Sequence, residues 1–227
     1  MKGRLIVFEG TDGSGKATQT TMLCQRLEQE KIPYRKITFP SYGKPSAAMV
    51  EEYLQGKLGK KPSDVNAYAA SMFYAMDRYA SYKQDWGEFY NDGGLIVADR
   101  YTTSNAVHQA SKLPEEERKE FLDWLFDLEY RLLELPTPDL VFYLDMPTEV
   151  TEKLMRRREK AEGSSADIHE QDAAYLRSCR DNARAIADAC GWRLVNCALD
   201  DEPRTVEDIH GEVYTQVTGL LRGCPAR

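Results

Sequence analysis

The feature that most constrains the fold is a glycine-rich segment that follows a short apolar run. Residues 10–17 match the pattern G-x-x-x-x-G-K and read Gly10-Thr11-Asp12-Gly13-Ser14-Gly15-Lys16-Ala17. An apolar run at 4–9 precedes the segment, and a helical pattern at 15–30 follows it. Consecutive backbone N–H groups in such a turn, at the positive end of a helix, form a concave site for anions. The sequence therefore predicts a strand, a phosphate-binding loop and a helix in this order.

Strand-like and helix-like patterns alternate along the rest of the chain. Apolar runs rich in branched and aromatic residues predict strands at 4–9, 34–39, 95–99, 140–145 and 192–197. Helical patterns fall at 15–30, 46–54, 65–82, 102–111, 115–133, 148–158, 172–190 and 206–221. This alternation is typical of a parallel sheet. We therefore expect an α/β fold with a five-stranded parallel sheet and helices on both faces, in three layers.

Length and composition favour one domain. The 227 residues are 42% hydrophobic and 10% aromatic, which is enough for a single core. No Pro/Gly/Ser-rich linker and no internal repeat divides the chain. We expect a single domain over residues 1–227, with a lid at about 156–170, where a basic cluster runs into small and polar residues.

Charge and cysteine content narrow the class of protein. Thirty basic and 37 acidic residues give a net charge of -7, which disfavours a nucleic acid as the main partner. No apolar run approaches the roughly 20 residues that a bilayer requires. The five cysteines include no Cys-x-x-Cys pair, which argues against a zinc site or a disulfide framework. The sequence therefore predicts a cytoplasmic protein that binds neither nucleic acid nor a membrane.

Charged residues at the predicted strand ends are candidates for catalysis. Lys16 can reach the outer phosphates of a nucleotide as a point charge. Asp99 ends the predicted strand at 95–99, as the carboxylate of a Walker B strand does. Arg100 follows it and can bind a phosphate with two parallel hydrogen bonds. The residues expected to hold the nucleotide phosphates are Gly10, Thr11, Asp12, Gly13, Ser14, Gly15, Lys16, Ala17 and Thr18.

The loop departs from the usual pattern at its last position. A Ser or Thr there normally binds Mg²⁺ through its hydroxyl, but this chain has Ala17. Thr18 comes next, and a helix turns about 100° per residue, so its hydroxyl points elsewhere. We therefore expect Mg²⁺ to be held by nucleotide phosphates, by a carboxylate such as Asp99, and by water.

Several short motifs resemble the thymidylate kinase family in order and spacing. They are residues 8–16, Phe39-Pro40, residues 74–78, Asp99-Arg100-Tyr101 with Ser104-Asn105, and Leu144-Asp145 with Pro147 and Glu149. The resemblance covers residues 4 to about 200. It implies the fold of a P-loop nucleoside monophosphate kinase, transfer of the γ-phosphoryl group of ATP to dTMP with Mg²⁺, and a homodimer.

The resemblance assigns two residues of the predicted helix at 65–82 to the base of dTMP. Tyr74 stands where the family stacks an aromatic ring on thymine. Arg78 lies one helical turn later on the same face, where the family reads the O4 atom of thymine. Because an Arg side chain only donates hydrogen bonds, it suits O4 and disfavours the amino group of cytosine.

The other implied contacts involve the phosphate and the sugar. Arg100 stands where the family holds the phosphate of dTMP, and Asp12 where it keeps an acidic residue near the 3′-hydroxyl and the metal. Asn105 matches a residue near the base edge. The substrate-binding residues implied in this way are Asp12, Tyr42, Tyr74, Arg78, Arg100, Asn105 and His108.

Two positions depart from the family pattern. His108 stands where the family usually has a Tyr beneath the deoxyribose, which helps to exclude a 2′-hydroxyl, so we expect weaker rejection of ribonucleotides. Ser41 stands where the family often has an Arg, and Tyr42 follows it. One phosphate or metal contact is therefore expected to be missing.

A further catalytic cation is expected in the lid. Residue 13 is Gly, so the loop supplies no Arg, and family members of this kind carry basic residues in the lid. The resemblance therefore implies that Arg158 closes over the ATP phosphates, where positive charge accelerates phosphoryl transfer.

Other functions remain open at this point. A related kinase could act on another nucleoside monophosphate or on a deoxynucleoside, and His108 keeps this alternative alive. A non-catalytic nucleotide-binding module, such as a GTPase-like switch, is the alternative of a different class. Against it, the chain contains no Asn/Thr-Lys-x-Asp tetrapeptide to read guanine.

Overall fold

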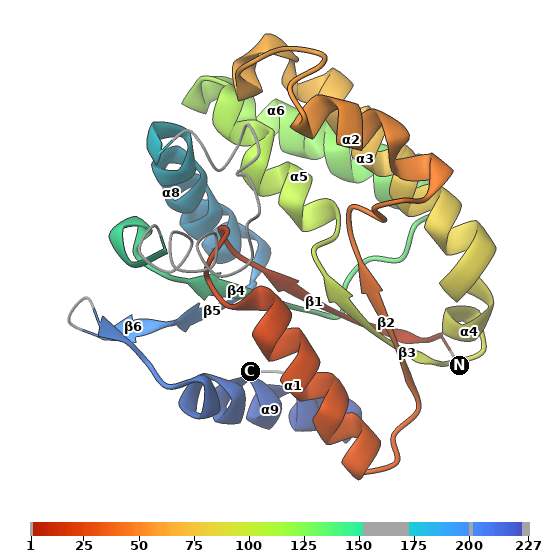
Figure 1. Ribbon diagram of the computed structural model, residues 1–227. Coiled ribbons are helices and arrows are strands. Elements are labelled where there is room, and N and C mark those ends of the chain that lie inside the picture. The colour runs from red at the N-terminus through yellow and green to blue at the C-terminus, as the bar shows by residue number, and fades with distance from the viewer. Residues whose placement is uncertain (1, 152–172, 200–201, 224–227) are drawn as a thin grey trace.

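A computed structural model describes residues 2–151, 173–199 and 202–223 (Figure 1). Its centre is a five-stranded sheet in the order β2-β3-β1-β4-β5, in which every neighbouring pair is parallel. The strands are β1 (Arg4–Glu9), β2 (Tyr34–Thr38), β3 (Leu95–Asp99), β4 (Leu140–Asp145) and β5 (Arg193–Asn196). The predicted five-stranded parallel sheet is confirmed.

The three central strands end within a few residues of one another, with β4 the longest at this edge. Phe8 of β1 pairs with Asp99 of β3 and with Phe142 of β4. All three strands are buried along nearly their whole length, as expected for apolar runs covered on both faces. Because their carboxyl ends meet at one edge of the sheet, the polar residues that follow β1 and β3 gather there.

Helices cover both faces of the sheet, as Figure 1 shows. The pair on one face is α1 (Lys16–Gln29) and α9 (Val206–Leu221). The helices above the other face are α2 (Ala48–Leu54), α3 (Ala67–Ser81), α4 (Gly87–Asn91), α5 (Thr102–His108), α6 (Glu115–Phe126) and α8 (Ala173–Cys190). The predicted three-layer arrangement is thereby confirmed.

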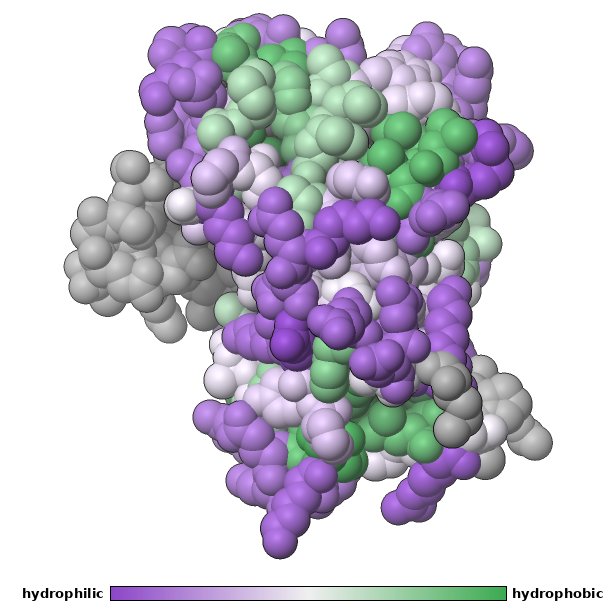
Figure 2. Space-filling model, turned by 90° about the vertical axis from the view of Figure 1, so that its right-hand side faces the viewer, coloured by the Kyte–Doolittle hydropathy of each residue, from purple (hydrophilic) through white to green (hydrophobic). Residues whose placement is uncertain are grey.

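Hydrophobic side chains are exposed along α3. Tyr68, Met72 and Met76 are spaced by one helical turn and are all exposed, and Met49 of α2 is exposed as well. Figure 2 shows hydrophobic patches in the upper part of the molecule, where Figure 1 places α2, α3 and α6. The middle of that view is mostly hydrophilic, and further hydrophobic patches lie near its lower end.

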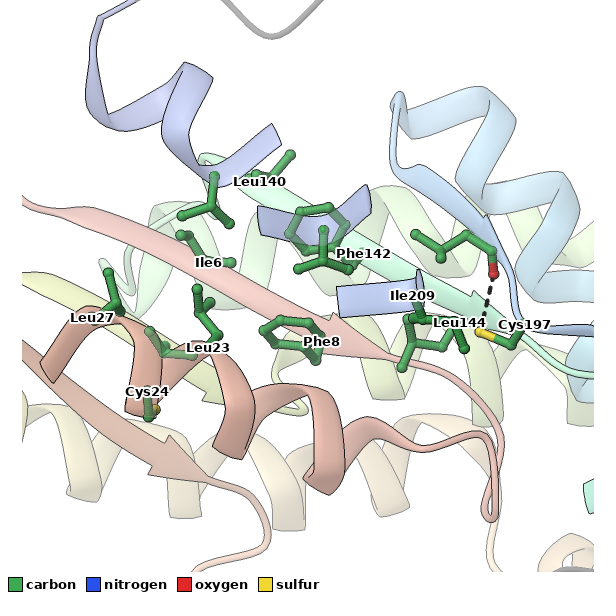
Figure 3. Packing of buried hydrophobic residues seen from close by; sticks show 14 of the residues in the cluster. Ile6, Phe8, Leu23, Cys24, Leu27, Leu140, Phe142, Leu144, Cys197 and Ile209 are labelled. Carbon is green, nitrogen blue, oxygen red and sulfur yellow. Dashed lines mark hydrogen bonds between the residues drawn. The ribbon is translucent and has the colours of Figure 1, made fainter. Parts of the chain in front are cut away.

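The core beneath α1 and α9 is a cluster of buried hydrophobic side chains. Phe8 of β1 stacks on Phe142 of β4, with ring centroids 5.4 Å apart. Leu23 of α1 and Ile209 of α9 pack on this pair of strands, as Figure 3 shows. This packing fixes α1, and with it the loop that leads into α1, against the end of β1.

Some elements differ from the sequence prediction. The helix expected over 115–133 becomes π-helical over Asp127–Leu132, and the one expected over 65–82 continues as a π-helical turn over Tyr82–Trp86. A π-helical turn holds one extra residue, which an apolar repeat does not reveal. A small antiparallel pair, β6 (Ala198–Leu199) with β7 (Glu202–Pro203), was not predicted.

Two further expectations concern the region around 152–172. The helix predicted at 148–158 extends beyond the described residues, and the lid predicted at about 156–170 lies wholly outside them. In the part of the chain that the structure describes, none of the helices has the length and hydrophobicity that a membrane span requires.

Candidate active site

A cavity of about 570 Å³ opens at the carboxyl edge of the sheet, between the phosphate-binding loop, α3 and α5. The sequence-predicted residues that line it are Asp12, Gly13, Gly15, Lys16, Ala17, Thr18, Tyr42, Tyr74, Arg78, Asp99, Arg100, Asn105 and His108. Gly10, Thr11 and Ser14 belong to the loop but do not line the cavity. Arg158 lies outside the described residues. The structure thus brings together residues from four separate segments of the chain.

The loop has the tight backbone that its glycines predict. A Cβ atom on Gly10 would lie 2.5 Å from the Ser14 hydroxyl oxygen and 2.8 Å from the Leu144 carbonyl oxygen. Gly15 precedes α1 with φ 94°, in the left-handed region that favours glycine. These two positions allow the chain to turn back over the end of β1 and enter the helix.

Lys16 is buried at the start of α1. Its ammonium group donates hydrogen bonds to the carbonyl oxygens of Gly10 (2.8 Å) and Thr11 (2.9 Å). Burial and the nearby Arg100 guanidinium lower the pKa of Lys16, and the Asp12 carboxylate, 3.6 Å away, opposes that shift. The ammonium group therefore lies over the loop beside a second cation.

Arg100 has an unusual backbone conformation. Its φ is 67°, which places a non-glycine residue in the left-handed region directly after β3. Its guanidinium donates hydrogen bonds to Asp12 Oδ1 (2.5 Å) and to Glu9 Oε1 (3.3 Å). Burial opposes the charged form, but these two carboxylates outweigh it and raise the pKa of Arg100. The backbone turn thus directs the side chain toward the loop.

Asp12 is held between these two cations. Burial alone would raise its pKa, but Arg100 and then Lys16 dominate and lower it well below the usual range. The Asp12 carboxylate therefore remains ionised, and it links the loop to the end of β3.

Glu9, the last residue of β1, was not predicted as a site residue. It is fully buried, and both of its carboxylate oxygens are used. Oε1 accepts from the Gly10 amide (3.0 Å) and from Arg100, while Oε2 accepts from the hydroxyls of Thr103 (2.8 Å) and Ser104 (2.6 Å). A charged residue at the end of a buried strand was the signal that could have found it, because a buried carboxylate requires partners.

Tyr74 and Arg78 line the cavity from α3, one helical turn apart. The Tyr74 ring packs edge-on against Tyr53, with centroids 6.4 Å apart. The Arg78 guanidinium forms a side-on pair with Glu129, in which Nε donates to Oε2 (2.6 Å) and Nη2 to Oε1 (2.5 Å). Burial disfavours the charge on Arg78, but Glu129 outweighs it and raises the pKa of Arg78.

Asn105 lines the cavity but has protein partners of its own. Its side-chain amide donates to the Ser71 carbonyl oxygen (3.2 Å) and to Glu129 Oε1 (3.4 Å). Sequence reasoning missed Glu129, since it is 51 residues from Arg78 and lies on the π-helical turn that the apolar pattern did not reveal.

The segment after β2 is fastened to α3 through Asp77. Its carboxylate accepts hydrogen bonds from the Ser41 amide (2.8 Å) and from the Ser46 hydroxyl (2.7 Å). Tyr42 lies between these two contacts, 63% exposed and at the rim of the cavity. Ser41, which stands where the family often has an Arg, therefore helps to hold the rim of the cavity in place.

His108 connects Arg100 to α8. Its Nε2 lies 3.3 Å from Arg100 Nη1, and its Nδ1 lies 3.6 Å from the Cys179 sulfur. The Tyr175 hydroxyl donates to the His108 carbonyl oxygen (2.7 Å). Since Arg only donates, Nε2 of a neutral imidazole is the acceptor and Nδ1 carries the proton. Burial raises the pKa of Cys179 to about 12, so its thiol stays protonated.

The chain as a whole is similar to known proteins. A family described as thymidylate kinase matches residues 8–209. A thymidylate kinase from Mycobacterium tuberculosis is 31% identical over 202 residues, which cover 88% of this chain and 93% of that protein. One from Afipia carboxidovorans is 32% identical over 229 residues, covering all of this chain and 94% of its own length. The solved thymidylate kinase from Candida albicans has the same fold, with a TM-score of 0.70 at 20% identity over 96% of this chain and 92% of that one.

Proposed function

The chain belongs to the thymidylate kinase family, and we propose that its cavity transfers the γ-phosphoryl group of ATP to the phosphate of dTMP. The products are dTDP and ADP. The observation that carries this proposal is the position of Asp12, which contacts both Lys16 of the loop and Arg100 of the strand end. Two cations thereby lie side by side in one cavity, which supports their proposed role of binding two reacting phosphates.

Lys16 and Arg100 have separate roles in this proposal, since each binds a different phosphate. We propose that Lys16 binds the outer phosphates of ATP, next to the loop amides, and that Arg100 binds the phosphate of dTMP. Phosphoryl transfer gains most of its rate from positioned charge, which both side chains supply. Asp12 and Glu9 hold Arg100 in place by accepting its hydrogen bonds.

The other end of the cavity suits the thymine base. Tyr74 offers an aromatic face and Arg78 offers only donors, so the pair favours a flat base with a carbonyl oxygen. His108 lines the same cavity and contacts Arg100, and we propose that it meets the sugar.

We propose that Mg²⁺ accompanies ATP. Within the described residues, no three His, Cys, Asp or Glu side chains could hold a metal ion together. Glu9 already uses both of its oxygens, which leaves Asp99 and Asp12 as the carboxylates that line the cavity. Two carboxylates are enough for Mg²⁺, because this ion keeps several of its waters and binds phosphates. The ion would neutralise charge on the transferred group.

Arg158 completes the proposed catalytic set. It lies outside the described residues, so its assignment rests on the resemblance and on the absence of an Arg at residue 13. We propose that residues 156–170 act as a lid within a single domain spanning the chain.

The exposed stripe on α3 supports a homodimer. Tyr68, Met72 and Met76 present apolar area on one helical face, and Met49 of α2 is exposed as well. We propose that a second copy covers this stripe. Sedimentation of the wild type and of Met72→Lys would test it, since a charge on the stripe should shift a dimer toward monomers.

We propose neither a nucleic acid nor a membrane as partner of this chain. Its net charge is -7, which opposes binding to nucleic acid. We propose that it acts in the cytoplasm on free nucleotides.

A substrate panel tests the proposed function. Purified protein with ATP and Mg²⁺ should phosphorylate dTMP with the highest kcat/KM among dTMP, dUMP, dCMP, UMP and thymidine. Thymidine should be poor, because it offers no phosphate to Arg100. Preference for another monophosphate, or for thymidine, would overturn the assignment, and nucleotide binding without turnover would favour a regulatory module.

A further inference from the structure

Glu129 fixes the direction of the Arg78 guanidinium. The pair is fully enclosed, with 1% of the Arg78 side chain and none of the Glu129 side chain exposed. Nε and Nη2 of Arg78 donate to Glu129, and Nη1 donates to the Tyr101 carbonyl oxygen at 3.4 Å. Of the five N–H groups of an Arg, this leaves one on Nη1 and one on Nη2. Arg78 therefore has a donor-only edge left for the cavity that it lines.

Glu129 is itself held by α5. The Thr102 hydroxyl donates to Oε2 at 2.7 Å, and the Asn105 amide lies 3.4 Å from Oε1. The carboxylate thus joins α3, α5 and the π-helical turn that follows α6. It does not line the cavity itself, so it acts on a substrate through the cavity residues that it holds, Arg78 by two short hydrogen bonds and Asn105 by one longer one.

We propose that Glu129 is a positioning residue that sets the base selectivity of the enzyme, by holding Arg78 so that two donors, and no acceptor, meet the exocyclic group of the base. This proposal rests on the proposed function. A fixed donor edge binds a carbonyl oxygen and leaves an amino group facing N–H groups that it cannot satisfy. A guanidinium free to rotate would withdraw from an amino group and reject it less.

The test compares Glu129→Gln with a matched variant, Asp145→Asn. Asp145 is also buried and forms a side-on pair, with the partly exposed Arg180 (2.6 and 3.1 Å), but it does not line the cavity. We expect Glu129→Gln to lower the ratio of kcat/KM for dTMP over dCMP at least about tenfold. The loss should come from a higher KM for dTMP, while the KM for ATP changes little. Asp145→Asn should lower the melting temperature and leave the ratio unchanged.

A milder variant covers the case in which Glu129→Gln does not fold. Thr102→Val removes the hydroxyl that holds Glu129 and keeps the ion pair, so it should lower the ratio by about two- to fivefold. The inference is overturned if folded Glu129→Gln has the wild-type ratio of kcat/KM for dTMP over dCMP. If only Thr102→Val folds, the same result with that variant overturns it. If wild-type protein itself fails to prefer dTMP, the proposed function fails instead, so the two outcomes are distinguishable.

Discussion

Asp12 Oδ1 accepts a hydrogen bond of 2.5 Å from Arg100 Nη2 and lies 3.6 Å from Lys16 Nζ. One carboxylate thus separates the two cations that the proposed reaction uses. The cations lower the pKa of Asp12 by more than burial raises it, so the group remains ionised in the folded protein.

Asp12→Asn should therefore destabilise the protein in a pH-dependent way. A carboxyl whose pKa is lowered on folding stabilises the native state above its unfolded pKa of 3.8, and loses that effect as the pH falls below it. The variant should unfold more easily at pH 7, by about 1–3 kcal/mol, with a smaller difference at pH 3. Urea denaturation at both pH values measures this. An equal loss of unfolding free energy at both pH values would show that the charge of Asp12 does not contribute to stability.

Lys16→Ala should lower turnover by about 10²-fold or more, because it removes the charge that stabilises the transferring phosphoryl group. The melting temperature should fall only modestly, since the variant loses two side-chain hydrogen bonds, to the carbonyl oxygens of Gly10 and Thr11. Steady-state kinetics and a melting curve check both statements. Turnover near the wild-type value would remove Lys16 from the mechanism.

His108→Tyr should raise the preference for dTMP over UMP, because a larger ring occupies the space that a 2′-hydroxyl would need. His108 also contacts Arg100 and Cys179, so the exchange should raise the KM for both substrates. The ratio of kcat/KM separates these effects, since the shared loss cancels. An unchanged ratio would mean that His108 only packs against α8 and Arg100.

Arg158→Ala should lower kcat about 10²-fold if its guanidinium caps the ATP phosphates. Arg156→Ala and Arg157→Ala are matched controls from the same basic cluster and should change kcat by less than about threefold. Kinetics at saturating ATP distinguish the three. A larger loss at Arg156 or Arg157 would move the catalytic role to that residue.

Lys112 should make stability rise with pH above neutrality. Its ammonium donates to the Tyr53 hydroxyl (2.8 Å) and the Val65 carbonyl oxygen (3.0 Å), and burial lowers its pKa to about 7. Between that value and 10.5 the unfolded chain binds more protons, so the free energy of unfolding increases with pH. The free energy of unfolding of the wild type minus that of Lys112→Met, measured at pH 7, 8 and 9, should rise by about 1 kcal/mol per pH unit. If the free energy of unfolding depends on pH in the same way in wild type and in Lys112→Met, the lowered pKa of Lys112 is contradicted.

The local part of the site was predictable from the sequence. The order of apolar strand, Gly10 to Lys16 and helix fixes the loop geometry, because short-range backbone constraints decide it. Tyr74 and Arg78 followed from the resemblance, and helical spacing placed them on one face.

Long-range partners were not predictable from one sequence. Glu129 meets Arg78 only because a π-helical turn and the packing of α3 bring them together. Cys179 meets His108 across 71 residues, which no local pattern encodes. Glu9 could have been found, since a charge at the end of a buried strand requires partners.

The left-handed backbone at Arg100 has a consequence for protein engineering. An L-residue in that conformation costs about 1–2 kcal/mol, which glycine would not incur. Glycine at position 100 would remove that cost, but it would also leave the Asp12 carboxylate and the fully buried Glu9 carboxylate without the guanidinium that donates to them, which costs more. A library that replaces strained backbone positions by glycine to raise heat resistance should therefore leave residue 100 unchanged.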